Sequence, residues 1–253
     1  MSTVNINPFT TTIPKLESVT EKYRFISTAE FIKDVQSLGY KLEYTRQPRR
    51  GLGMHYMSFS HPDMPKVEGL DLRVGFSNSH DGSHAFRGHI ETGVGICTNV
   101  LLAYIPDLAY AARIVHVGYA VSKVAAAIDA VRGRINHVID SVQELQSVNV
   151  TPEVAAEFIV KASELRDAKP YRLAELNTCR HRGQDTASAW DTFNRVQESL
   201  IKGGYQTKDV VTLPSGIETV VPGRRAKELT SVRERVQTNY KLWQLAVETL
   251  LKA

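Results

Sequence analysis

The sequence predicts an α+β protein: an N-terminal helix and an antiparallel β-sheet, a long central helix, and a helical C-terminal half. Runs of alternating apolar and polar residues occupy the first half, and the clearest, at 70–77 and 86–91, flank a polar turn. From 121 to 145 apolar residues recur every three or four positions, as in a helix. Glycine and proline residues separate the segments of both kinds.

The N-terminal segment, residues 1–22, is predicted to be an irregular arm, because it is rich in threonine and has little apolar periodicity. The first helix is expected to begin at Ser27, which fits a capping box with Glu30. Gly39 is well placed to end this helix in the left-handed conformation.

The predicted sheet is formed by hairpins. Asn78, Asp81 and Gly82 are residues that favour a tight turn, so residues 78–83 are expected to close the central hairpin. A loop at 47–53 with two glycines and a proline closes the preceding one. Strands are predicted at 40–46, 54–60, 70–77, 86–91 and 93–100.

The apolar stripe at 121–145 follows a heptad pattern and predicts one helix of about 40 Å. One interpretation packs this helix across a face of the sheet, and the other makes it a seam between copies of the chain. Either way, a sheet lobe at 23–118 precedes a mainly helical lobe at 119–253, which together are expected to form one compact unit.

The C-terminal half is predicted to contain three more helices and a small hairpin. Thr151 and Pro152 mark a helix start, since threonine caps a helix and proline favours its first position. Gly203 and Gly204 end the next helix. The predicted ranges are 151–168 and 187–202 for these helices, 205–223 for the hairpin, and 229–250 for a last helix whose basic face includes Arg224 and Arg225.

Composition favours a protein of a reducing cytoplasm. The chain has 253 residues, 42% of them hydrophobic, and a net charge of +4, which is compatible with a polyanionic partner. Its 2 cysteines do not suggest a disulfide framework. No apolar run approaches the ~20 residues that a membrane helix needs. No cofactor or metal is predicted, because no phosphate-binding loop or paired ligand motif is present.

Five stretches together resemble the phage- and plasmid-related family catalogued as domain of unknown function 932. The resemblance implies a role in handling, protecting or recombining DNA, because members are encoded on mobile elements. The order of helix, antiparallel hairpins and long helix is also similar to that of ring-forming single-strand annealing proteins. The five stretches are YRFIST at 23–28, NSHDGS at 78–83, CTN at 97–99, RIVHVG at 113–118 and WDTFNRVQESLIKGG at 190–204.

The preferred hypothesis is a DNA-binding protein that acts in recombination or strand annealing, binds single-stranded DNA and forms a homo-oligomer. Clustered cations interleaved with aromatic residues suit a nucleic-acid surface. The candidate nucleic-acid contacts are Arg46, Arg49, Arg50, Tyr56, Arg73, Arg87, Arg224 and Arg225. The candidate ligand contacts within the motifs are Asn78, His80, Asp81, Ser83, Asn99, Arg113 and His116.

Two alternatives remain open at this point. A metal-dependent enzyme could use a cluster of histidines and an aspartate, since imidazole and carboxylate are common ligands and proton carriers. A counter-defence protein that binds a host factor would need no catalytic group. The residues of the enzyme hypothesis are His80, Asp81, His84, His89 and His116.

Overall fold

The structure is a computed structural model, and it describes residues 7–9, 25–48, 52–67, 69–94, 101–103, 112–115, 119–180 and 186–251. The chain divides into two compact units. Unit 1 comprises Met1–Val138 and Ser231–Arg233, and unit 2 comprises Ile139–Thr230 and Glu234–Ala253. Antiparallel strands and helices both contribute, which confirms the predicted α+β class.

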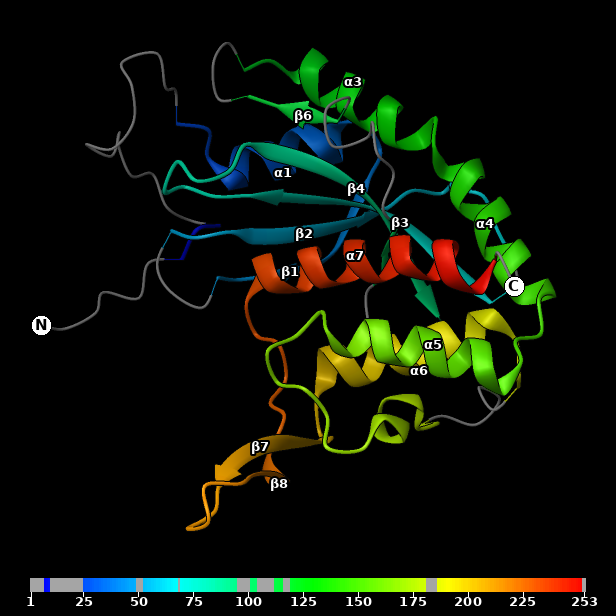
Figure 1. The fold of residues 1–253 in the computed structure, drawn as a ribbon. Helices are drawn as coiled ribbons and strands as arrows, with labels where there is room; N and C mark the ends of the chain where they lie inside the picture. Colours follow the sequence, from blue (N-terminus) through cyan, green and yellow to red (C-terminus); the bar gives the residue numbers. More distant parts are fainter. Residues whose placement is uncertain are drawn as a thin grey trace, which may run out of the picture. The chain divides into compact units, whose positions relative to one another are not determined.

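Unit 1 is built on a sheet with the strand order β1-β2-β3-β4-β5, and β6 pairs with β4. Every pairing is antiparallel, as the alternating pattern predicted, and Figure 1 shows these strands with the helices of the unit. The predicted strand at 93–100 overlaps the end of β4, and the rest of it lies outside the described residues. The elements are α1 (Thr28–Ser37), β1 (Lys41–Arg46), β2 (His55–Ser60), β3 (Leu70–Asn78), β4 (Phe86–Val94), β5 (Leu101–Ala103), β6 (Arg113–Ile114) and α3 (Val121–Arg132).

Helix α1 begins and ends close to the predicted residues, but the predicted capping box is wrong. Ser27 makes no side-chain capping bond, although its carbonyl accepts the first hydrogen bond of the helix, from the amide of Phe31 at 3.0 Å. Gly39 has φ of 88°, so the predicted left-handed residue follows the helix.

Helices α1 and α3 cover the apolar face of the sheet. Phe31 of α1 stacks on Phe86 at 4.2 Å between ring centroids and meets Phe76 edge-on at 5.0 Å. Gly88 of β4 lets α3 approach closely, because a Cβ atom there would lie 2.7 Å from Cγ2 of Val131. All of these side chains are buried, so the core of unit 1 lies between the sheet and these helices.

The predicted long helix is two helices, α3 and α4 (Ile135–Ser147). The break falls at Gly133, where the amide of Arg134 bonds the carbonyl of Val131 at 3.1 Å in a tighter turn. The division between the units falls inside α4 rather than before α3, because α3 packs on the sheet. Val121, at the start of the stripe, is 42% exposed, and the other described residues of the stripe are buried within the chain, which favours packing over a seam between copies: Val124, Ile128, Val131, Ile135, Val138, Val142 and Leu145.

Unit 2 has a helical core. Phe193 of α6 stacks on Trp190 at 5.8 Å and meets Trp243 of α7 edge-on at 5.8 Å. The caps at Thr151 and Ser188 accept hydrogen bonds from backbone amides at 3.4 and 3.1 Å, and the first confirms its predicted role. The elements are α5 (Pro152–Ser163), η1 (Leu173–Asn177), α6 (Ala189–Lys202), β7 (Gln206–Thr212), β8 (Glu218–Arg225) and α7 (Val232–Leu250).

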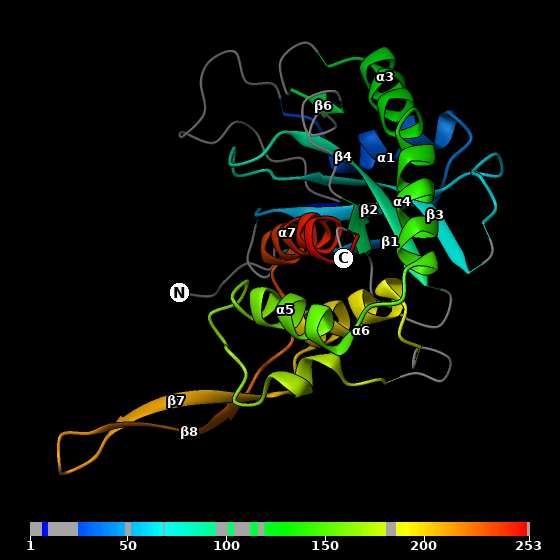
Figure 2. The ribbon, with the colours of Figure 1, turned by 45° about the vertical axis from the view of Figure 1, so that its right-hand side comes forward.

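The predicted hairpin of unit 2 is the two-stranded ribbon β7–β8, which Figure 2 shows as a separate extension from the helices of this unit. It is longer than predicted and ends at Arg225. Arg224 and Arg225 therefore lie on a strand, and their predicted place on the basic face of the last helix is wrong. Pro222 and Gly223 explain the error, since both disfavour a regular strand in sequence patterns.

Candidate nucleic-acid interface

One transverse row of the sheet collects four of the predicted contact residues. The strand register places Arg46 opposite Tyr56, Tyr56 opposite Ser77, Ser77 opposite Arg87, and Arg87 opposite Arg113. Directly opposed residues of paired strands point to the same face. At about 4.8 Å per strand, the row spans about 19 Å. We call these five residues the arginine row.

The guanidinium groups of the arginine row differ in exposure. Arg113 is exposed, whereas Arg46 and Arg87 are half-buried. Nε of Arg87 is buried and has no hydrogen-bond partner among the described residues. Because a buried donor normally has a partner, this atom is an unmet hydrogen-bond donor of the row.

Glu91 lies on the same face and anchors two tyrosines. Its carboxylate, 2% exposed as a residue, accepts hydrogen bonds from the hydroxyls of Tyr44 at 3.1 Å and Tyr56 at 3.0 Å. Burial raises the pKa of Glu91 above its usual value, and the nearby donors and the charge of Arg73 oppose this shift only in part. Gly75 makes room for this network, since a Cβ atom there would lie 1.7 Å from the Tyr56 hydroxyl oxygen.

The network gives Tyr56 and Arg73 structural partners. Tyr56 is 4% exposed and donates to Glu91, so it holds the carboxylate instead of presenting a ring to a base. Arg73 pairs with Asp71 and lies 3.8 Å from Glu91. Of the predicted nucleic-acid contacts on the sheet, the arginine row therefore retains Arg46 and Arg87, and it joins to them Arg113 from the predicted ligand contacts.

His89 contributes no charge to this face at neutral pH. Its Nε2 atom lies 2.8 Å from Oγ of Ser77, and the residue is 1% exposed. Burial, with the positive charge of Arg87, lowers the pKa of His89 to about 3. The imidazole is neutral at pH 7, so the positive charge of the row comes from its arginines.

The turn between β3 and β4 is built as the sequence predicted. Oδ1 of Asp81 accepts a hydrogen bond from the Ser83 amide at 2.9 Å, and Gly82 has φ of 75°. Ser83 also donates from its hydroxyl to Oγ of Ser79 at 3.2 Å. Asp81 and Ser83 thus serve the turn itself, and both are exposed.

His80 points from this turn into a buried chain of hydrogen bonds. Oγ1 of Thr28 lies 2.8 Å from Nε2 of both His55 and His80. Nε2 of His80 is 3.0 Å from the carbonyl of Pro8, and Nδ1 of His55 is 3.2 Å from the carbonyl of Gly53. Because carbonyls only accept, these two ring nitrogens carry the protons, and the Thr28 hydroxyl accepts from His80 and donates to His55. We call Thr28, His55 and His80 the histidine relay.

The described residues of the enzyme hypothesis do not form one cluster. His80 belongs to the histidine relay, His89 bonds Ser77, and Nδ1 of His84 lies 2.6 Å from the carbonyl of Ser83. The described ranges contain no group of three or more His, Cys, Asp or Glu side chains that could hold a metal ion. Asn78 is buried at the end of β3 opposite His55. Arg49, Arg50, Asn99 and His116 lie outside the described residues.

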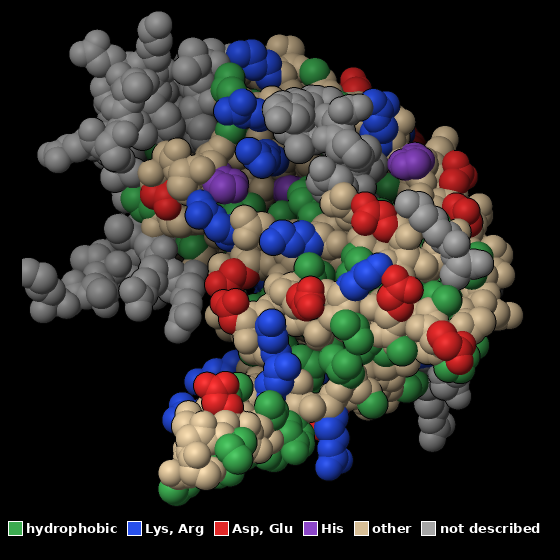
Figure 3. Space-filling view, in the orientation of Figure 1, with side chains coloured by type: hydrophobic (Ala, Val, Ile, Leu, Met, Phe, Trp, Pro, Cys, Tyr) green, Lys and Arg blue, Asp and Glu red, His purple; other side chains and the backbone are tan. Residues whose placement is uncertain are grey.

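A second basic site lies at the base of the β7–β8 hairpin in unit 2. Nη1 of Arg225 donates to the carbonyl of Gly204 at 2.7 Å, and Arg224 is exposed beside it. Lys169 joins them, because its carbonyl accepts from the amide of Lys208 at 3.0 Å. Figure 3 shows basic side chains near this hairpin. The sequence pattern did not indicate Lys169 and Lys208, since the first follows a predicted helix and the second lies in a predicted hairpin, far apart in the sequence.

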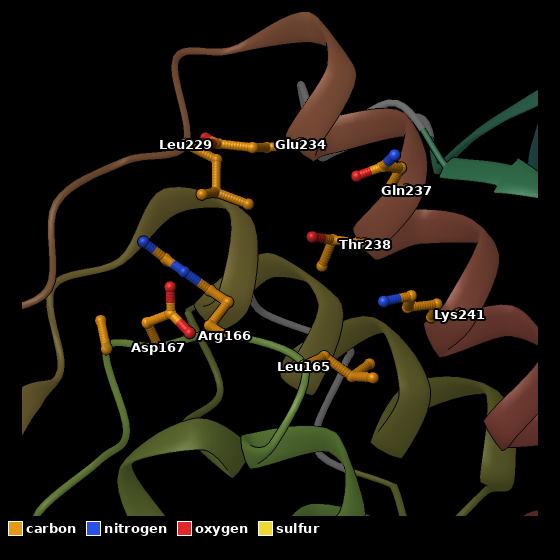
Figure 4. Close-up of a pocket in the computed structure, with 9 residues that line it drawn as sticks. Leu165, Arg166, Asp167, Leu229, Glu234, Gln237, Thr238 and Lys241 are labelled. Atoms are coloured by element: carbon orange, nitrogen blue, oxygen red, sulfur yellow. The ribbon is translucent and has the colours of Figure 1, made fainter.

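A cavity of about 330 Å³ in unit 2 has a lining of mixed charge. Figure 4 shows Gln237, Thr238 and Lys241 of α7 across from the segment that follows α5. Arg166 from that segment already donates to the carbonyl of Lys227 at 2.9 Å. Charges of both signs line the cavity, so no single class of ligand is indicated.

Comparisons with known proteins place the chain in a family. The family described as "Domain of unknown function (DUF932)" matches residues 15–243. UPF0380 protein YfjQ of Escherichia coli (strain K12) is 25% identical over 94% of this chain and 85% of its own length. UPF0380 protein YafZ of the same strain is 24% identical over 77% of this chain and 74% of its own length. No solved structure matches. None of the helices in the described residues is long and apolar enough to cross a membrane. The chain belongs to the DUF932 family.

Proposed function

We propose that this protein binds DNA through the arginine row, with single-stranded DNA as the preferred form. The observation that carries the proposal is the strand register, which sets Arg46, Arg87 and Arg113 in one line on one face. Guanidinium groups bind phosphate oxygens in a bidentate way, and a line of them suits a chain of phosphates.

Within the described part of the chain, no carboxylate neutralises the charges of the row. None of its three arginines forms a salt bridge with a described residue, whereas Arg73 on the same face pairs with Asp71 and Glu91. Unpaired cations gain most from an anionic partner, because they attract counterions that binding releases. The row therefore supports phosphate contacts more directly than Arg73 does.

The single-stranded form follows from the burial of the row. Arg46 and Arg87 are half-buried, so a thin, flexible strand reaches them more easily than a rigid duplex does. Phosphate contacts carry little sequence information. We therefore propose binding without strong sequence preference, which suits a role in annealing or recombination of phage or plasmid DNA.

Charge reversal in the row tests the proposal. The double variant Arg46→Glu/Arg113→Glu should bind a fluorescent single-stranded oligonucleotide at least tenfold more weakly than the unchanged protein, as measured by anisotropy at two salt concentrations. A duplex of the same sequence should bind more weakly than the single strand.

The matched control is Lys33→Glu/Lys66→Glu, which changes the net charge equally at exposed positions of unit 1 outside the row. This control should keep most of the affinity. Equal losses in the two double variants would reduce the effect to net charge, and no loss in the row variant would refute the proposal.

A further inference from the structure

Exposed apolar side chains concentrate on the β7–β8 hairpin. Most large hydrophobic residues of the described ranges are buried, as expected for a folded protein. An isolated two-stranded hairpin buries little, and exposed apolar clusters commonly mark contact surfaces. The hairpin carries five of the nine large hydrophobic residues that are exposed among those the structure describes: Val210, Val211, Leu213, Ile217 and Val220.

The backbone edges of the hairpin are poor sites for adding a strand. The amide of Lys208 on β7 already bonds the carbonyl of Lys169 at 3.0 Å, so it points away from β8. Pro222 is the cross-strand partner of Lys208, so its backbone groups also point away from the other strand. Proline has no N–H to offer there. Contact through a side-chain face is therefore favoured over contact through an edge.

One face of the hairpin has charges at its two ends and an apolar middle. The register pairs Lys208 with Pro222, Val210 with Val220, and Thr212 with Glu218. These residues alternate along each strand and share a face. Val210 and Val220 are 61% and 50% exposed, and Lys208 and Glu218 are exposed as well. We call these six residues the self-complementary face.

We infer that a second copy of this chain docks on the self-complementary face, with the two hairpins packed antiparallel about a two-fold axis. The axis would pass through the pair Val210–Val220, so each apolar pair covers the other. Lys208 of each copy then lies over Glu218 of its partner. A two-fold contact requires such a pattern, because each residue must match its symmetry mate.

Within one hairpin the two charges cannot pair. Lys208 and Glu218 belong to residue pairs four positions apart along the ribbon, which is about 13 Å. Among the described residues, neither forms a salt bridge. A partner copy supplies the opposite charge that each lacks.

Nucleic acid fits this face less well. Glu218 is the only charged residue at its distal end, and the basic residues Arg224 and Arg225 lie at the base of the ribbon. A phosphate backbone would meet an acid and valines there. Over the same length the opposite face carries Asp209, Val211, Thr219 and Val221, so its one charge there is an acid.

A charge swap tests the inference. Lys208→Glu and Glu218→Lys each place like charges against each other twice in a two-fold dimer, so each should weaken dimerisation at least tenfold in sedimentation velocity over a concentration series. The double variant Lys208→Glu/Glu218→Lys restores opposite charges and should return the dissociation constant to within about threefold of the original.

Val210→Ser should also weaken the dimer, whereas Val211→Ser on the opposite face should not. A protein that stays monomeric at every concentration, or single reversals without effect, would overturn the inference. A double swap that fails to restore the dimer while its circular dichroism is unchanged would overturn it too. Loss of oligonucleotide affinity without any change in mass would assign the hairpin to nucleic acid instead.

Discussion

At the scale of single residues, the histidine relay makes the β3–β4 turn part of the fold. His80 is 2% exposed, and its ring contacts that of His55 at 4.9 Å between centroids. Thr28 connects the two rings with one hydroxyl group. His80 therefore holds the turn against α1 and the segment at Pro8.

Removal of the Thr28 hydroxyl tests this structural role. Thr28→Val keeps the shape of the side chain but deprives both imidazoles of a partner, so it should lower the free energy of unfolding by about 1–3 kcal/mol. Urea denaturation measures the change. Thr45→Val on β1 is the control, because Thr45 is exposed. Equal stability of the Thr28 variant and the unchanged protein would contradict the relay.

His89 gives unit 1 a pH dependence of defined sign. Burial and the charge of Arg87 lower its pKa from 6.5 to about 3 in the folded chain. Between pH 6.5 and about pH 3 this histidine is protonated in the unfolded chain but stays neutral in the folded chain. The free energy of unfolding therefore falls as the pH is lowered through this range.

His89→Gln should flatten this dependence, since glutamine can still bond Ser77 but does not titrate. Urea denaturation from pH 7.5 to 4.5 measures the slope of stability against pH. His137→Gln, at an exposed histidine of α4, should leave the slope unchanged. If both variants keep the original slope, the effect does not come from His89.

At the scale of elements, Gly88 fixes the distance between β4 and α3. An added Cβ atom would lie 2.7 Å from Val131 and 2.8 Å from Ala112. Gly88→Ala should therefore lower the free energy of unfolding by about 1–3 kcal/mol. In a Val131→Ala background the cost should be smaller, because part of the clash is gone; a double-mutant cycle in urea measures this coupling. Purely additive costs would contradict the contact.

Sequence periodicity predicted most elements because helix and strand patterns are local. It failed where a local pattern was ambiguous. The apolar stripe continues from α3 into α4 across Gly133, since the turn there does not shift the buried positions. The capping box at Ser27 matched in residue type, yet the Ser27 side chain makes no capping bond in the structure.

The candidate site was predictable only in part, because its residues are far apart in the sequence. Alternation placed Arg87 and His89 on one face, and the register confirms it. The alignment of Arg46, Arg87 and Arg113 depends on pairing among β1, β2, β3, β4 and β6, which no local pattern specifies. The hydrogen bond between His80 and Thr28 could not be predicted either, because 52 positions separate the two residues in the sequence.

At the scale of the whole molecule, the two units carry different surfaces. Unit 1 carries the arginine row on its sheet. Unit 2 carries the hairpin, which has Arg224 and Arg225 at its base and the self-complementary face along its length. We propose that the first binds DNA and the second joins two copies. A dimer would double the number of arginine rows on one particle, which raises the effective concentration of a second contact on the same strand.

The salt dependence of DNA affinity tests the central proposal most directly. Arg46→Gln, Arg87→Gln and Arg113→Gln together remove three phosphate contacts. In anisotropy titrations over a series of salt concentrations, the slope of log affinity against log salt for a single strand should become shallower by about 2, at roughly 0.7 per contact. An unchanged slope in a folded triple variant would show that the arginine row does not contact DNA.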